Sequence, residues 1–122
     1  AEDYLETILM LNQRMGRVRS IDVVNELGYT KASVSIAMKK LRENGYIAVD
    51  GEGNLTLLEP GREIAERIYS RHRLLTHFFV QLGVDEEVAA EDACKAEHIL
   101  SEQTLEKIRE YALLHDAQDS VK

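Results

Sequence analysis

The hydrophobic pattern changes its period near Gly45, and this change constrains the fold more than any other feature of the sequence. Before it, apolar residues recur at helical spacing. After it, Tyr46–Val49 and Asn54–Leu58 have the short apolar pattern of strands and flank the turn-forming segment Asp50-Gly51-Glu52-Gly53. Two such runs joined by turn residues predict a β-hairpin. The chain is therefore expected to place a hairpin directly after a helical region.

Three helices are expected before this hairpin, at Asp3–Met15, Ile21–Leu27 and Lys31–Asn44. Ser20 and Thr30 precede the second and third of these helices and are their predicted N-caps. Two helices joined by a tight glycine-containing turn have the layout of a helix-turn-helix. The positions expected to face inward are Ile21, Val24, Leu27, Val34, Met38 and Leu41. Three helices followed by a hairpin predict a winged helix.

The rest of the chain is expected to be helical. Helices are predicted from Gly61 to Leu82, from the cap residue Asp85 through Leu100, and from Ser101 onward. The fold class is thus mostly α: a winged helix-turn-helix at residues 1–60, then an all-helical domain at 61–122. This second part has more apolar residues than so few helices can hide. They are expected either to form a homodimer interface, which we favour, or to pack on the winged helix of the same chain: Phe78, Phe79, Ile99, Leu100, Leu105 and Ile108.

Charge is distributed unevenly along the chain, whose net charge is −7. Between Arg14 and Arg42 there are seven basic and two acidic residues, a local balance of +5, whereas from Gly61 onward eight basic and thirteen acidic residues give −5. A basic segment in an acidic protein favours one surface for phosphates, although a lysine-rich helix face can also be merely solvated.

Cys94, Glu97 and His98 lie within Glu86–Leu100, a segment without Gly or Pro. On a helix their spacing of three and four residues places the thiol, the carboxylate and the imidazole on one face. These groups together are typical of part of a transition-metal site. The alternative is that Cys94 is a small buried hydrophobe and that Glu97 and His98 are ordinary surface residues.

Three residues on one helix rarely complete a coordination sphere, so further ligands must come from other helices. Asp3 and Glu6 share a face of the first helix, and His72 lies in the long helix after the hairpin. Two carboxylates in a first turn also stabilise a helix dipole without any metal, and this alternative stays open.

The chain resembles the diphtheria-toxin-repressor and manganese-transport-regulator family (DtxR/MntR) of metal-dependent repressors. The resemblance covers nearly the whole chain and depends on four separated motifs: Glu2-Asp3-Tyr4-Leu5-Glu6, the segment Thr30–Leu41, Arg71-His72-Arg73-Leu74-Leu75, and Cys94-x-x-Glu97-His98. It implies a homodimer with an N-terminal winged helix and a helical dimerisation domain. The chain looks like the two-domain form, which lacks the SH3-like domain of some relatives.

The resemblance implies a metal site made of Asp3, Glu6, His72, Cys94, Glu97 and His98. Asp3 and Glu6 match the manganese branch of the family, whereas Cys94 matches the iron branch. Two ancillary ligand positions of the iron branch fall on Thr76 and Ala90, which cannot serve. Carboxylates suit Mn²⁺ and a thiolate favours softer ions. We therefore expect Fe²⁺ or Mn²⁺ as the co-repressor, with a slight preference for Fe²⁺ and one principal ion per subunit, and Co²⁺ or Zn²⁺ as substitutes in vitro.

The same resemblance implies that the third helix reads double-stranded DNA at a palindromic operator of metal-uptake genes. Lys31, Lys39 and Lys40 would contact phosphates, supported by Ser20 and Thr30 at helix N-termini. The positions that face the groove in relatives are Ala32, Ser33, Ser35 and Ile36. Ile36 replaces a polar base-reading residue of iron-type relatives and could touch thymine methyls.

Two other functions compete with this hypothesis. One is a winged-helix dimer that regulates transcription without sensing a metal. The other is a metallo-hydrolase using His72, Glu97 and His98, which is disfavoured because the sequence has no nucleophile motif and no phosphate-binding glycine loop. No enzymatic activity and no small-molecule substrate are therefore expected. One cysteine suits a reducing compartment and no apolar run is long enough to span a bilayer, so a cytoplasmic protein without a membrane partner is expected.

Overall fold

The computed structural model describes residues 2–121, with side chains described for residues 3–116. The described chain contains six helices and one two-stranded sheet, which confirms the predicted mostly α fold class. It divides into two compact units, Ala1–Ile68 and Tyr69–Lys122. The boundary expected between residues 60 and 61 stays a prediction.

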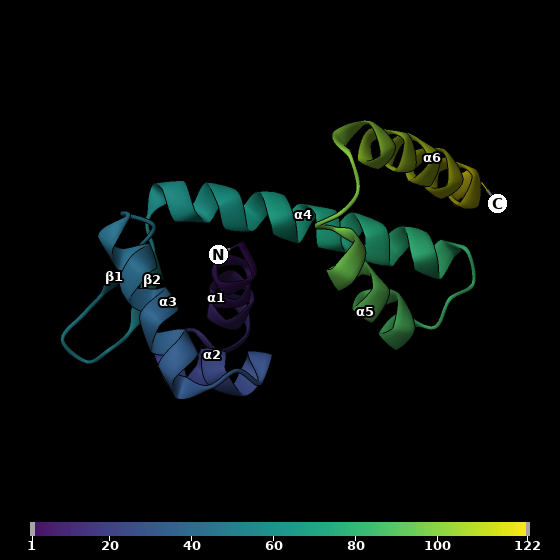
Figure 1. Ribbon diagram of the computed structural model, residues 1–122. Coiled ribbons are helices and arrows are strands. Elements are labelled where there is room, and N and C mark those ends of the chain that lie inside the picture. The colour runs from purple at the N-terminus through teal and green to yellow at the C-terminus, as the bar shows by residue number, and fades with distance from the viewer. Residues whose placement is uncertain (1, 122) are drawn as a thin grey trace. The chain divides into compact units, whose positions relative to one another are not determined.

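The first unit begins with three helices, α1 (Glu2–Met15), α2 (Ser20–Leu27) and α3 (Lys31–Glu43), close to the expected ranges (Figure 1). The predicted inward stripe of α3 is confirmed, because Val34, Met38 and Leu41 are all buried. The rest of the core of this unit comes from α1, α2 and the connector between them, the strands and the helix that follows the hairpin: Leu5, Ile8, Leu9, Leu11, Val18, Val23, Ile47, Leu55, Leu57, Ala65 and Ile68. This core presents the opposite face of α3 to solvent.

Helix α2 differs from the prediction at its start. Ser20 is the first helical residue and Arg19 holds the N-cap position, where its N–H donates a hydrogen bond of 2.9 Å to the Asp22 carboxylate. The buried side chain of α2 is Val23, whereas Ile21 is 43% exposed. The prediction that Ser20 caps and Ile21 faces inward was therefore wrong, because the acidic side chain at the third position supplies the capping oxygen.

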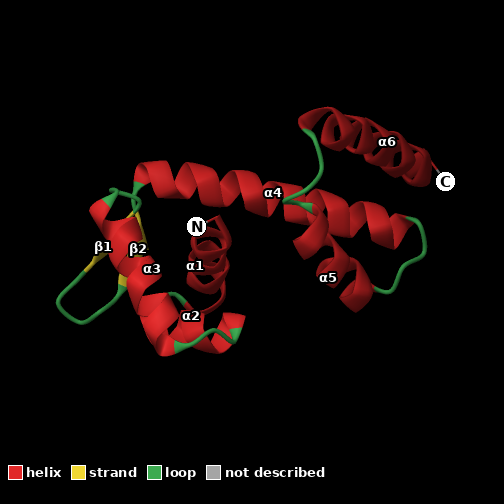
Figure 2. Ribbon diagram, in the orientation of Figure 1, coloured by secondary structure: helices red, strands yellow, loops and turns green. Residues whose placement is uncertain are grey.

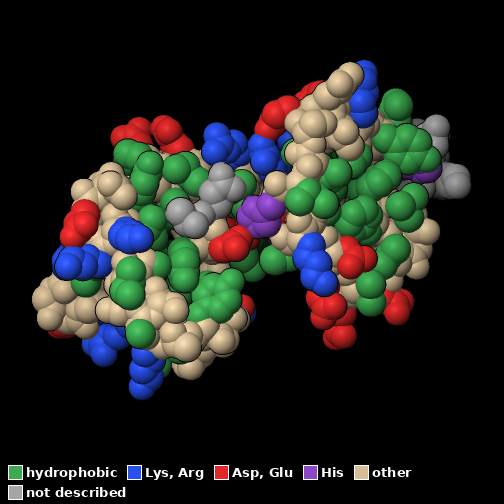
Figure 3. All heavy atoms as spheres, in the orientation of Figure 1, with side chains coloured by type: hydrophobic (Ala, Val, Ile, Leu, Met, Phe, Trp, Pro, Cys, Tyr) green, Lys and Arg blue, Asp and Glu red, His purple; other side chains and the backbone are tan. Residues whose placement is uncertain are grey.

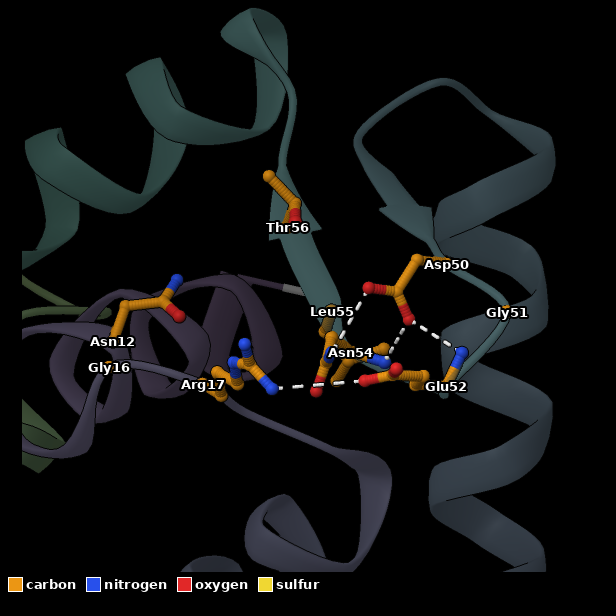
Figure 4. Close-up of a pocket in the computed structure, with 9 residues that line it drawn as sticks. All are labelled: Asn12, Gly16, Arg17, Asp50, Gly51, Glu52, Asn54, Leu55 and Thr56. Atoms are coloured by element: carbon orange, nitrogen blue, oxygen red, sulfur yellow. Dashed lines mark hydrogen bonds and ion pairs between the residues drawn. The ribbon is translucent and has the colours of Figure 1, made fainter.

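The hairpin consists of β1 (Ile47–Val49) and β2 (Leu55–Leu57), paired antiparallel with Ile47 opposite Leu57 (Figure 2). Its turn is held by Asp50, whose carboxylate accepts hydrogen bonds from the N–H groups of Glu52 and Asn54, each at 2.9 Å (Figure 4). Arg17 and Glu52 form an ion pair of 3.8 Å beside a polar hollow of about 590 Å³. The turn is thus built from its own polar groups.

Helix α4 (Glu59–Gln81) begins two residues earlier than predicted, with Pro60 in its first turn, where a missing N–H is tolerated. Gly61 is required there, because a Cβ atom at this position would lie 2.2 Å from the Tyr46 carbonyl oxygen. That carbonyl accepts the Leu58 N–H at 2.9 Å and therefore cannot move freely. The contact fixes the start of α4 against Tyr46, the residue that precedes β1.

The second unit contains the end of α4, α5 (Glu86–Ala96) and α6 (Glu102–Val121), joined by two loops (Figure 2). Its core is formed by Leu75, Ala93 and Leu105. Of the residues named as interface candidates, Leu105 belongs to this core, and three partly buried ones pack against it: Phe79, Leu100 and Ile108. Ile99, by contrast, is 80% exposed.

Polar contacts join α4 to α6 at two places in this unit. The Arg71 guanidinium pairs with Glu102, and the His77 Nε2 atom lies 2.9 Å from an Asp116 carboxylate oxygen that also accepts from Gln81. These contacts hold the segment of α4 that carries His72 in place against α6. Among the described residues, no helix combines the length and the apolar character needed to cross a membrane.

Candidate metal centre and nucleic-acid interface

The end of α5 positions two of the predicted ligands. The helix stops at Ala96, Glu97 is its C-cap with an N–H that donates to the Ala93 carbonyl at 3.0 Å, and His98 lies in the turn that comes next. The expectation of a continuous helix through Leu100 was therefore wrong. The next helix begins at once, because the Ser101 hydroxyl accepts the Thr104 N–H.

Glu97 is a fully buried carboxylate that meets two imidazole rings. Its side chain is 0% exposed, with one oxygen 3.3 Å from His72 Nδ1 and the other 3.3 Å from His98 Nε2. Within the described part of the chain, the two Glu97 oxygens and the His72 Nδ1 atom have no hydrogen-bond partner. Burying an ionised carboxylate without hydrogen bonds is costly, so this arrangement needs a positive charge.

The separation of Glu97 and His72 fits two ligands of one cation. Neighbouring ligand atoms that each lie about 2.1 to 2.2 Å from one divalent ion are separated by about 3.0 to 3.6 Å, and the 3.3 Å between His72 Nδ1 and a Glu97 oxygen falls in this range. Imidazole nitrogen and carboxylate oxygen together suit Fe²⁺, Mn²⁺, Co²⁺ or Zn²⁺. The second unit thus brings His72 and Glu97 to the separation of two metal ligands, and it places His98 beside the other Glu97 oxygen.

The remaining predicted ligands lie elsewhere on the helices. Cys94 is exposed on α5, which contradicts the alternative in which it is a buried hydrophobe. Asp3 and Glu6 lie in the first two turns of α1, where Asp3 is half-buried and Glu6 is 5% exposed. Their participation with His72 remains a prediction.

Sequence reasoning missed one residue that supports the site. Thr76 was considered only as a ligand, but its hydroxyl donates a hydrogen bond of 2.8 Å to the His72 carbonyl one turn earlier. A threonine four residues after a candidate ligand in a helix is the signal that indicates this contact. This hydrogen bond satisfies the Thr76 hydroxyl donor and restrains the backbone that carries His72.

The outer face of α3 carries the residues expected to contact nucleic acid. Thr30 is its N-cap as predicted, because its hydroxyl oxygen accepts the Ser33 N–H at 3.1 Å. The other candidates on α3 are all exposed: Lys31, Ala32, Ser33, Ser35, Ile36, Lys39 and Lys40. Ser20, at the start of α2, is half-buried. Lys and Arg side chains lie at several places on the surface of the first unit (blue in Figure 3).

A helix-turn-helix with a wing, followed by a helical unit with a carboxylate buried between imidazoles, defines the class of metal-responsive DNA-binding regulators. Two family models match the chain: the N-terminal DNA-binding domain of iron-dependent repressors over residues 1–55, and their metal-binding and dimerisation domain over residues 58–114. The chain belongs to this iron-dependent repressor family.

Individual relatives agree with the family models. The chain is 36% identical over 110 residues to an uncharacterised helix-turn-helix transcriptional regulator of Methanocaldococcus jannaschii, covering 88% of each chain. It is 32% identical over 121 residues to the transcriptional regulator MntR of Bacillus subtilis, covering 99% of this chain and 85% of the relative. Both relatives are transcriptional regulators by name.

A solved manganese-dependent transcriptional repressor in complex with manganese is similar in fold, with a TM-score of 0.83 and 27% identity. The match covers 91% of this chain and 51% of the repressor, so the chain spans about half the length of that structure.

Proposed function

We propose that this chain is a metal-activated repressor that acts as a homodimer on a palindromic DNA operator of metal-uptake genes. Fe²⁺ or Mn²⁺ would be its co-repressor, held by Asp3, Glu6, His72, Cys94, Glu97 and His98. The single observation that carries the proposal is the buried Glu97 carboxylate, whose oxygens face the His72 and His98 nitrogens at 3.3 Å. A divalent ion supplies the charge that this buried group requires.

The chain's own helices supply the route from ligand to DNA. Asp3 and Glu6 are on α1, which packs in the same unit as α2 and the wing, whereas the other ligands belong to the second unit. Ligands drawn from both units would restrict the orientation of the DNA-reading helices. A dimer must hold two such helices about 34 to 36 Å apart to reach successive major grooves. Couplings of this kind are typically about 1 to 3 kcal/mol, or about 5- to 150-fold in affinity.

The contacts to DNA are proposed from the exposed face of α3. Lys31, Lys39 and Lys40 would bind phosphates, with Ser20 and Thr30 at the helix N-termini in support. Ala32, Ser33, Ser35 and Ile36 would face the bases. Backbone contacts give affinity and register, and contacts to base edges give specificity.

The test is binding of the chain to a duplex selected from a randomised DNA library in the presence of Mn²⁺. Fluorescence anisotropy is then measured anaerobically against free Mn²⁺, Fe²⁺, Co²⁺ and Zn²⁺, and again after chelation. We expect affinity to rise with metal and to fall on chelation, with Fe²⁺ or Mn²⁺ active at the lowest free concentration. Operator affinity that is unaffected by metal and chelator would instead favour the metal-independent regulator.

Asp3→Asn and Glu6→Gln test the contribution of α1. Each variant should require a higher metal concentration for DNA binding while leaving metal-free, non-specific DNA binding unchanged, because the charge removed lies outside α3. The matched control is Glu91→Gln, which removes an exposed carboxylate of α5. Variants that respond to metal as the parent chain does would remove Asp3 and Glu6 from the ligand set.

A further inference from the structure

The outer face of α3 carries an apolar strip at its centre. Ile36 is 59% exposed, and the exposed Ala32 lies one turn before it on the same face. At 100° per residue these two positions point away from the buried stripe of Val34, Met38 and Leu41. Ile36 is therefore a large apolar side chain that is exposed on the face of the helix opposite the core.

The neighbours of this strip point to a nucleic-acid partner. Lys39 and Lys40 are exposed on either side of it, one turn after Ile36, and no acidic residue occurs in α3 before Glu43. An apolar centre between ammonium groups is complementary to a surface that has apolar groups recessed between phosphates. The major groove has this arrangement, since the thymine C5-methyl group lies on its floor between two phosphate backbones.

The first two turns of α3 contain few groups that could hydrogen-bond a base edge. From Lys31 to Ile36 there is no Asn, Gln or Arg, the side chains that make bidentate contacts with adenine or guanine. The Ser33 hydroxyl already accepts a hydrogen bond of 2.9 Å from the Thr30 hydroxyl in the N-cap. The largest side chain available for base contact in these turns, apart from Lys31, is Ile36.

We propose that Ile36, with Ala32 beside it, determines operator specificity by contacting thymine C5-methyl groups in the major groove. This inference rests on the proposed DNA-binding function and adds the chemical group that is read. It requires thymine at one or two fixed positions of each half-site. Uracil, which lacks only the methyl group, is a poor substitute there.

The experiment uses the duplex selected with Mn²⁺ and replaces each thymine by deoxyuridine, one position at a time. Loss of one buried methyl contact corresponds to about a fourfold weaker Kd, so we expect this loss at one or two positions per half-site and none elsewhere. Ile36→Ala should bind the thymine and uracil duplexes equally at those positions. Its thermal unfolding should match that of the parent chain, since the side chain is exposed.

Ile21→Ala is the matched control, because Ile21 is also an exposed isoleucine of the helix-turn-helix but lies on α2. It should keep the fourfold preference for thymine. If the duplex is bound but no deoxyuridine position weakens binding, or if Ile36→Ala keeps the preference, the inference is overturned. Absence of metal-dependent binding to any duplex would instead overturn the proposed function itself.

Discussion

The two units of the chain differ in how their polar side chains are satisfied. In the first unit, the oxygens of Thr30, Asp22 and Asp50 each accept a backbone N–H that a helix start or a turn leaves without a partner. In the second unit, Glu97 is fully buried, and its two oxygens lie 3.3 Å from imidazole nitrogens of His72 and His98 without a hydrogen-bond partner in the described chain. The first arrangement stabilises a fold, whereas the second is the basis of the proposed metal site.

This difference indicates which part of a regulator can be made to respond to a ligand. A buried charge costs several kcal/mol unless it is paired, and a ligand that binds only the folded state returns about 2.7 kcal/mol when present at 100 times its Kd. The second unit is therefore expected to depend on its cation, while the DNA-reading surface is formed by its own capped helices. Substitutions in each unit can test this contrast.

The largest effect is expected for Glu97→Gln, which keeps the shape of the side chain and removes its charge. Changes behind a metal ligand commonly cost 10- to 100-fold in affinity, so loss of this ligand should weaken Mn²⁺ or Co²⁺ binding by about 100-fold or more. Titration calorimetry measures the affinity, and thermal unfolding with and without metal measures the stabilisation. The metal-free variant should be at least as stable as the parent chain, because the buried charge at position 97 has been removed.

Glu91→Gln on the exposed side of α5 controls for the loss of one charge and should change neither quantity. If Glu97→Gln bound metal normally, Glu97 would be a structural residue and the contrast between the units would disappear.

The next effect concerns the first unit alone. Gly61→Ala should destabilise it by about 1 to 3 kcal/mol, because the new Cβ would meet the Tyr46 carbonyl oxygen at 2.2 Å. Gly51→Ala is the matched control, since nothing lies within 4 Å of its Cβ position and its φ is not positive. Urea unfolding of the metal-free chain measures both. Equal stabilities would show that the start of α4 is not fixed by this contact.

A smaller effect is expected at the DNA surface. Lys39→Ala with Lys40→Ala should weaken binding to all duplexes by about tenfold and reduce the slope of log K against log salt by about 2, because each phosphate contact contributes about 0.9. Lys107→Ala, on the exposed face of α6, should leave affinity and slope unchanged. A double variant with the parent salt dependence would exclude α3 as the DNA-reading helix.

The smallest effect is a pH dependence of the wing. The pKa of Asp50 is lowered below its ordinary value of 3.8, mainly because its carboxylate accepts hydrogen bonds from the Asn54 backbone and then from the Asn54 side chain. A lowered pKa in the folded state means that the stabilisation is present above about pH 3.8 and is lost as the pH falls through the folded-state pKa. Amide hydrogen exchange of Glu52 and Asn54 should accelerate accordingly, after correction for intrinsic rates. The Asp50→Asn variant should lack this acid transition. If its exchange rates followed the same pH profile as those of the parent chain, the prediction would be contradicted.

The sequence predicted the fold well where one helix contains its own signals. The Thr30 cap and the stripe of Val34, Met38 and Leu41 follow from local chemistry and the helical period, and the structure confirms them. Ser20 was misassigned because two capping oxygens compete within three residues, and only the folded backbone shows that Asp22 supplies the bond.

The candidate site was less predictable, because its central contact joins residues far apart in the chain. The approach of His72 to Glu97 depends on how α4 and α5 pack, which no local pattern encodes. The end of α5 at Ala96 was also missed, since no Gly or Pro marks it. Leu105 was named as a candidate for either a subunit interface or packing on the winged helix, because apolar periodicity shows that a residue is buried but not by which partner; it lies in the core of the second unit.

The end of α5 has a consequence for how such a sensor could diverge. Glu97 and His98 come after the helix instead of lying within it, so their directions depend on the residue at which the helix terminates. Each residue added to or removed from a helix rotates the next segment of the chain by about 100° and shifts it by about 1.5 Å. Substitutions that touch no donor atom could therefore retune the coordination geometry, and with it the ion that is preferred.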